Sequence, residues 1–281
     1  MVCSKLRAEP MIDFSAPYMQ RAVLEMLLLA VPAGLLGSWI VLRRLAFFTH
    51  AVGTVSFPAL VLASAWGIAP QLAALAAALG FGVAQERLVR TGRLATDAAT
   101  GLLLVGALAA GVVLASDVFE SGAEVDTLLF GSLIGLTQRD VWLTALVAVA
   151  AVVLDAGLRR HWLATGFEPD SAQALGVRPV LADRLLLVGV AAAAIVALDA
   201  VGALLVTVVL VVPAATVRLL TDRLGTLQLG AIGLAAAEGV AAVWLADELN
   251  VGAGPALAVL GGSIFAVVAT ATALRARAVT A

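Results

Sequence analysis

Long apolar stretches, separated by short groups of charged residues, Gly or Pro, occupy almost the whole chain. An α-helix that crosses the hydrocarbon core of a bilayer needs roughly 17 to 25 mainly apolar residues. Nine stretches reach or approach that length, so we expect eight or nine transmembrane helices. The stretches cover residues 22–41, 51–68, 69–85, 98–115, 141–157, 185–201, 202–220, 224–246 and 251–274.

The overall composition excludes a water-soluble fold. Hydrophobic residues make up 62% of the 281 residues, charged residues make up 13%, and the mean hydropathy is +1.07. Soluble domains carry about a quarter charged residues. The apolar residues are mainly Ala, Val, Leu and Gly, which allow helix backbones to approach closely in lipid. The sequence therefore predicts an all-α polytopic membrane protein with a single transmembrane domain, residues 22–274, between tails at 1–21 and 275–281.

The sequence also lacks the residues that several kinds of chemistry require. The single cysteine, Cys3, rules out an intramolecular disulfide and a metal cluster built from cysteines. Basic and acidic residues number 17 and 19, a balance that gives no reason to expect nucleic acid as a partner. No phosphate loop of the form GxxxxGK[ST] is present. We therefore expect neither ATP hydrolysis nor a bound cofactor in this chain.

The distribution of basic residues predicts the orientation, because cytoplasmic loops retain positive charge. With the N-terminus outside, the inner side collects all but four of the basic residues. The four on the outer side are Lys5, Arg7, Arg21 and Arg139. We therefore expect the C-terminus in the cytoplasm. Acidic residues at 117–126 and 247–248 then lie outside, either as solvated loops or as an electronegative vestibule that attracts cations.

Residues 128–136, LLFGSLIGL, are apolar but about half as long as a membrane span. Such a segment is tolerated at membrane depth where protein buries it. We expect a short re-entrant helix here. A full span would invert the orientation of everything downstream and remove the arginine bias.

The longest polar connection on the inner side covers residues 158–183. It begins with a basic cluster, Arg159 to His161, for which lipid headgroup contact is expected. Pro169 near a helix start and Gly176 just past its end predict a short helix over residues 169–175. This helix either shortens a surface loop or forms a rigid element that a cytoplasmic partner can push.

Three passages resemble one family of transporters. Residues 34–58 read GLLGSWIVLRRLAFFTHAVGTVSFP, residues 167–176 read FEPDSAQALG, and residues 201–220 read VGALLVTVVLVVPAATVRLL. In this order they are similar to the permease subunits of bacterial zinc and manganese ABC transporters, the ABC-3 family. LFGSL at 129–133 and GAGPAL at 252–257 are smaller similarities.

The resemblance implies an ATP-driven importer in the bacterial plasma membrane, for zinc, manganese or iron. It implies a cytoplasmic ATPase subunit that carries ATP and Mg²⁺, an extracytoplasmic substrate-binding protein, and a second permease subunit, identical or paralogous. The short helix would then be the element that couples the permease to the ATPase. Its residues are Phe167, Glu168, Pro169, Asp170, Ala172, Leu175 and Gly176.

The metal site departs from the family pattern. Members commonly carry Phe-Gly-Asp-Ala-Leu-Ser-His after the paired arginines, with the Asp and the His as metal ligands. Here the matching stretch runs from Phe48 to Thr54, with His50 at the Asp position and Thr54 at the His position. The resemblance therefore leaves His50 as the candidate metal ligand, with Thr54 beside the substrate pathway. The Asp and His that would place two metal ligands at i and i+4 on one helix face are absent here. The alternative to a metal ion is therefore a non-metal cargo.

Three carboxylates inside the predicted spans are further candidates for the substrate pathway, because charge in lipid is costly. Glu238 lies well inside its span, and its alternative role is structural. For Glu25 and Asp199, placement at a helix end near the interface is the alternative. If Glu238 or Asp199 bound a proton or sodium ion, the chain would instead be an ion-coupled secondary transporter. The altered metal pair also leaves open a membrane scaffold that transports nothing.

Overall fold

The computed structural model describes residues 17–90, 96–118, 129–132, 135–167, 179–249 and 251–280, and within these ranges it contains helices and no strand. The helices are α1 (Pro17–Leu42), α2 (Ala46–Trp66), α3 (Pro70–Arg90), α4 (Thr96–Val118), α6 (Gln138–Phe167), α8 (Pro179–Val201), α9 (Val206–Arg218), α10 (Leu224–Leu249) and α11 (Ala253–Thr280).

Each predicted apolar stretch coincides with one helix, and the all-α polytopic fold is confirmed. Seven helices in the described ranges are long and apolar enough to cross a membrane. The shorter apolar helices Pro70–Gln85 and Val206–Arg218 correspond to the predicted stretches 69–85 and 202–220. At the two ends, α1 begins at Pro17, before the predicted start at residue 22, and α11 continues to Thr280.

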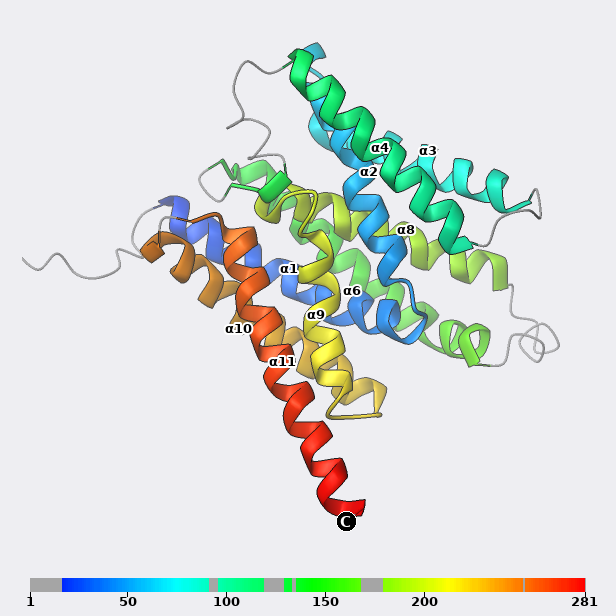
Figure 1. Cartoon of the computed structure of the whole chain (residues 1–281), viewed down its shortest axis with the longest axis vertical. Coiled ribbons are helices and arrows are strands. Elements are labelled where there is room, and N and C mark those ends of the chain that lie inside the picture. The colour runs from blue at the N-terminus through cyan, green and yellow to red at the C-terminus, as the bar shows by residue number, and fades with distance from the viewer. Residues whose placement is uncertain are drawn as a thin grey trace, which may run out of the picture.

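Helix α1 lies at the centre of the bundle, where it packs against α6, α8, α9 and α10. Within its most apolar window 67% of the residues are buried, against 11% in α11. In Figure 1, α3 and α4 lie at one edge of the molecule, and α11 extends past the other helices toward the C-terminus. The outer faces of α4, α6 and α11 carry exposed apolar side chains, as expected for lipid contact.

Two glycines let α1 approach its neighbours at backbone distance. A Cβ atom at Gly37 would lie 2.1 Å from the carbonyl oxygen of Leu210 in α9. At Gly34 it would lie 2.5 Å from the backbone nitrogen of Ile232 in α10. In lipid, where close van der Waals packing drives helix association, such positions require glycine.

Part of the predicted re-entrant segment packs against the turn between α8 and α9. Gly131 and Gly202 both have positive φ, at 77° and 81°, and their backbones touch. The Leu204 N–H donates to the Leu129 carbonyl at 3.2 Å, and the Ser132 N–H donates to the Asp199 carbonyl at 3.2 Å. Backbone groups of this segment therefore have hydrogen-bond partners within the protein, in α8 and in the turn that follows it. Residues 128, 133 and 134 lie outside the described ranges.

The predicted coupling helix also lies outside the described ranges. Helix α6 ends at Phe167 and α8 begins at Pro179, so the structure describes both elements that flank residues 168–178. The helix over 169–175, with Glu168, Asp170, Ala172 and Leu175, stays a prediction.

Candidate functional site

His50 lies one turn into α2, and its half-buried imidazole faces α9. Its Nδ1 atom is 3.3 Å from the hydroxyl oxygen of Thr207. Thr207 is the second residue of α9, the helix that begins just after the Gly202 turn. The turn thus positions a hydroxyl against the only histidine among the candidate site residues. One signal in the sequence could have identified Thr207, namely its polarity within an apolar stretch that resembles the transporter family.

Thr54 does not extend this pair. It is buried, and its hydroxyl donates to the backbone carbonyl of His50 at 3.0 Å. A hydroxyl bonded to the preceding turn of its own helix is the usual arrangement for Thr in an apolar helix. At the position where the family commonly has a histidine, the side chain therefore serves α2 itself.

Glu25 lies inside the protein, between α1 and α6. The residue is fully buried, and its Oε1 accepts a hydrogen bond of 2.5 Å from the Thr144 hydroxyl of α6. Its Oε2 has no hydrogen-bond partner among the described residues. The burial of Glu25 between α1 and α6 leaves its side chain no path outward to lipid headgroups, and its place along the membrane stays a prediction.

Asp199 belongs to a polar group that joins three helices. The Gln71 side chain of α3 donates from Nε2 to Asp199 Oδ2 at 3.2 Å and to Asp140 Oδ1 at 3.3 Å. Asp140 also caps its own helix, because its Oδ2 accepts from the N–H of Thr137 at 2.9 Å and from the Thr137 hydroxyl at 2.7 Å. Gln71 and Asp140 were not among the predicted site residues. Each lies near the end of an apolar stretch, where a polar residue is expected at the membrane interface.

Glu238 is isolated in an apolar environment. The residue is 3% exposed, and its Oε1 has no hydrogen-bond partner within the described ranges. It borders a cavity of about 10 Å³ between α1, α9, α10 and α11, at the lower limit for one water molecule. The cavity is lined by Met26, Ala30, Val209, Pro213, Ala235, Glu238, Gly239 and Leu257.

The described residues do not bring the predicted candidates into one ligand cluster. No group of three or more His, Cys, Asp or Glu side chains in the described ranges could hold a metal ion. His50 contacts Thr207, Glu25 contacts Thr144, and Glu238 lies among apolar residues. In this chain the histidine and the carboxylates therefore form separate sites.

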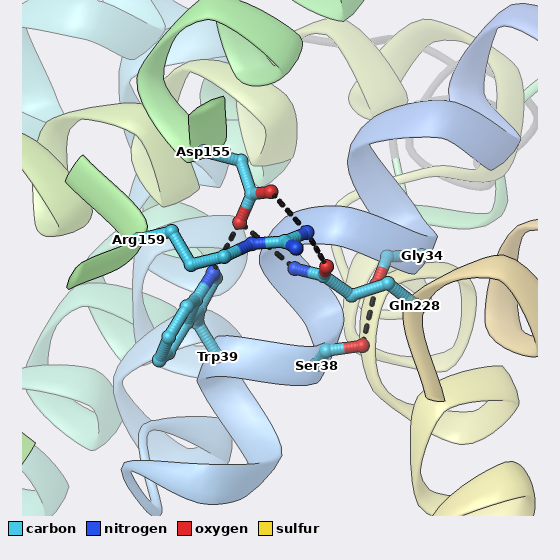
Figure 2. A network of polar contacts seen from close by, with 6 residues as sticks. All are labelled: Gly34, Ser38, Trp39, Asp155, Arg159 and Gln228. Carbon is cyan, nitrogen blue, oxygen red and sulfur yellow. Dashed lines mark hydrogen bonds and ion pairs between the residues drawn. The ribbon is translucent and has the colours of Figure 1, made fainter. Parts of the chain in front are cut away.

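A further polar network connects the last turn of α1, the body of α6 and the second turn of α10 (Figure 2). Asp155 Oδ1 accepts from Trp39 Nε1 at 2.7 Å and from Gln228 Nε2 at 2.8 Å. Asp155 Oδ2 forms a 2.8 Å ion pair with Arg159 Nη2, which also donates to Gln228 Oε1. Arg159 pairs with Asp155, which lies one helical turn earlier, while its side chain is 41% exposed. The expected contact of this basic cluster with lipid headgroups stays a prediction.

The comparisons with known proteins place the chain in a family. The sequence profile described as "ABC 3 transport family" matches residues 15–272. The chain belongs to the ABC 3 transport family. The family resemblance predicted from the sequence is therefore confirmed, and this ABC 3 chain is a multi-pass membrane protein of a transport family.

Curated relatives of this ABC 3 chain match over most of its length. The manganese transport system membrane protein MntC of Halalkalibacterium halodurans is 26% identical over 252 residues, 90% of this chain and 86% of the relative. The manganese import system permease protein ScaB of Streptococcus parasanguinis is 26% identical over 248 residues, 88% of each chain. Among solved structures, PsaBC from Streptococcus pneumoniae in complex with Fab has the same fold. Its TM-score is 0.82 at 23% identity, over 90% of this chain and 91% of the other.

Proposed function

We propose that this protein is the membrane-spanning permease subunit of an ATP-driven importer, and that its cargo is a divalent metal ion. Membership of the ABC 3 family and end-to-end similarity to manganese permeases support this proposal most strongly. Manganese is the first candidate cargo, followed by zinc and iron. The chain would lie in the bacterial plasma membrane with its N-terminus outside and its C-terminus in the cytoplasm, as the arginine distribution favours.

Within the permease, His50 is the proposed metal ligand and Thr207 the residue that orients it. The Thr207 hydroxyl lies at Nδ1, which leaves Nε2 free to face a metal ion. One imidazole does not complete a coordination shell, so the proposed site takes further ligands from other groups, such as bound water or the second permease subunit. An imidazole suits zinc and iron, whereas manganese prefers oxygen ligands, so cargo selectivity depends on those additional ligands.

Energy for transport would come from a separate ATPase subunit that binds ATP and Mg²⁺. The segment between α6 and α8, residues 168–178, is the proposed contact with that subunit. An extracytoplasmic binding protein would deliver the ion to the opposite side. Closure of the ATPase would shift the population between inward-open and outward-open states, which is alternating access.

The deciding experiment measures metal accumulation in cells. The chain is coexpressed with its candidate ATPase and binding protein, and cellular manganese, zinc and iron are measured by elemental analysis. The matched control carries an ATPase subunit that cannot hydrolyse ATP. We expect one metal to rise only with the active ATPase. An assembled complex that raises none of the three would refute the metal cargo.

An ion-coupled secondary transporter is the second candidate, favoured by two buried carboxylates. Glu25 and Glu238 each have an oxygen without a partner in the described ranges, as a proton or sodium site in a membrane would. Vesicles that contain the chain alone distinguish the two. Uptake driven by a proton or sodium gradient without ATPase would support the second candidate, and uptake only with ATPase and ATP would exclude it.

A further inference from the structure

A set of polar contacts, the polar joint, connects α1 and the residue that follows it with α6, α8 and α10. We define it by six residues: Trp39, Arg43, Asp155, Arg159, Asp183 and Gln228. It has two centres, one at Asp155 and one at Arg43. The Arg43 centre lies next to the ends of α6 and α8 that flank residues 168–178, whereas Asp155 lies about three helical turns before the end of α6 at Phe167. Trp39, Asp155 and Gln228 are buried, whereas the side chains of Arg159 and Asp183 are 41% and 46% exposed.

The first centre holds three helices on a single carboxylate (Figure 2). Asp155 of α6 is 4% exposed and accepts hydrogen bonds from Trp39 of α1 and Gln228 of α10 at 2.7 and 2.8 Å. Arg159 supplies the counter-charge from the same helix. The hydrogen bonds from α1 and α10 to this buried carboxylate fix the relative positions of the helices, because a donor that moves away leaves a carboxylate oxygen with one hydrogen bond fewer in a medium of low dielectric constant.

The second centre joins the end of α1 to α6 and α8. Arg43 Nη2 lies 2.7 Å from Asp183 Oδ1 of α8 and 2.5 Å from the Thr165 hydroxyl of α6. That hydroxyl in turn lies 3.2 Å from Asp183 Oδ1. Gly166 makes room for the guanidinium, since a Cβ atom there would lie 3.0 Å from Arg43 Nε.

Two tryptophans connect these centres. Trp39 and Trp162 pack edge to face with ring centroids 5.4 Å apart. The indole N–H of Trp162 donates to the Ala182 carbonyl at 2.8 Å, one residue before Asp183. A displacement of α6 against α8 therefore strains the contacts of both centres with α1.

The polar joint includes Arg43, which lies in the short turn that leads from α1 to α2. Arg43 follows the last residue of α1, Arg44 adopts φ of 57°, and α2 starts at Ala46. His50 lies one helical turn further on. A tight turn with a residue in the left-handed region limits how far Arg43 and the start of α2 can move relative to each other.

We propose that the polar joint transmits movement of the 168–178 connection to α1 and the start of α2, and so couples the ATPase to the His50 site. Asp155 and Arg43 are positioning residues in this scheme, and neither contacts the cargo. The inference rests on the proposed function, because it requires an ATPase partner that pushes on this connection.

The test uses the whole complex of permease, ATPase and binding protein in proteoliposomes. Asp155→Asn keeps the size of the side chain but removes the charge that holds Arg159. The matched control is Asp222→Asn, which removes an exposed i, i+4 ion pair with Arg218. We measure subunit assembly, ATP hydrolysis and metal ions imported per ATP. Asp155→Asn is expected to leave assembly and hydrolysis within about twofold and to lower import per ATP about tenfold, a typical size for coupling between sites.

A charge exchange provides the second variant if Asp155→Asn does not fold. Arg43→Ala and Asp183→Ala are each expected to uncouple import from hydrolysis, and the exchange Arg43→Asp with Asp183→Arg to restore part of the import per ATP. Unchanged import per ATP in the single variants would refute the proposed role of the polar joint. Loss of folded protein in every variant would also refute it. A wild-type complex without ATP-dependent metal uptake would refute the proposed function, and the joint with it.

Discussion

At the scale of single residues, hydroxyl groups with similar sequence surroundings have different roles. Thr54 donates to its own helix, whereas Thr207 reaches the imidazole of His50 on another helix. The two buried glutamates differ in the same way. Each has one oxygen without a partner in the described ranges, but only Glu25 also accepts a hydrogen bond from a hydroxyl, that of Thr144, whereas Glu238 borders a small apolar cavity. Partners on other helices therefore decide the effect of a polar side chain within a span.

The Thr207 hydroxyl predicts a specific loss of metal uptake. Thr207→Val removes the hydroxyl with little change in volume, so the imidazole loses the contact that orients it. We expect the metal concentration for half-maximal uptake to rise about tenfold, as for other residues that orient metal ligands. Uptake is measured across a range of metal concentrations in cells. Thr216→Val is the control, because the Thr216 hydroxyl bonds only within α9, and equal effects of the two variants would contradict the prediction.

The unpartnered oxygen of Glu238 predicts a change in stability. Glu238→Met replaces the carboxylate by an apolar side chain of similar size, and we expect the free energy of unfolding to rise by about 1–3 kcal/mol. Thermal melting in detergent measures the change. In the matched variant Glu25→Met the Thr144 hydroxyl loses its acceptor, so melting should occur at a lower temperature. A lower melting temperature for Glu238→Met would show that its carboxylate has a partner. Loss of uptake in a stabilised Glu238→Met protein would place Glu238 in the substrate pathway.

At the scale of helices, α1 organises the bundle through positions that have no side chain. Gly34 and Gly37 bring it against the backbones of α10 and α9, and its last turns bear Trp39 and Ile40, both fully buried. Helices α4 and α11 contribute mainly surfaces for lipid, as their low burial indicates. Movement of α1 therefore affects several neighbours together, whereas α11 can tolerate displacement with fewer consequences.

A methyl group at Gly37 should prevent the close contact between α1 and α9. In Gly37→Ala the new atom would lie 2.1 Å from a backbone oxygen, so the helices must separate. We expect the yield of folded protein in membranes to fall at least severalfold. An added atom that overlaps a backbone oxygen is among the changes that destabilise a folded protein most. Fluorescence-detected size-exclusion chromatography measures this yield. Gly157→Ala of α6 is the control, with nothing within 4 Å of its Cβ position, and a folded yield of Gly37→Ala equal to that control would disprove the close contact.

At the scale of the whole molecule, the charge distribution and the fold agree on the two ends of the bundle. Tyr18 of α1 and Asp247 of α10 lie 3.4 Å apart at one end, through the tyrosine hydroxyl and a carboxylate oxygen. The polar joint lies toward the opposite ends of these helices, where the arginines gather. The proposed orientation puts that arginine-rich end, with the connection between α6 and α8, on the cytoplasmic side.

This orientation can be measured with single cysteines. Cys3→Ser removes the only native cysteine, and Asp222→Cys or Asp247→Cys then introduces one exposed thiol. A membrane-impermeant maleimide is expected to label Cys at 247 in intact cells and Cys at 222 only after permeabilisation. The reverse pattern would invert the orientation and place the 168–178 connection outside, away from any ATPase. Each variant must retain uptake to serve as its own control for folding.

Hydrophobic patterning by itself determined the helical architecture, including the approximate positions of the nine helices in the described ranges. This succeeds because each span must satisfy its own backbone hydrogen bonds in lipid, so length and apolar content are nearly sufficient. Ordered family motifs added the transport class, and they identified His50 at a position that commonly holds an aspartate.

Only the tertiary structure decided which polar side chains meet. Gln71 reaches Asp140 and Asp199 across more than sixty residues, and Gln228 reaches Asp155 across 73. A polar residue near a span end has the same local pattern whether it faces lipid headgroups or a neighbouring helix. Its role depends on helix rotation and on contacts distant in sequence, which local periodicity does not record. For that reason the sequence determined the spans, while the packing of α2 against α9 determined the contact between His50 and Thr207, and the packing of α1, α6 and α10 determined the joint at Asp155.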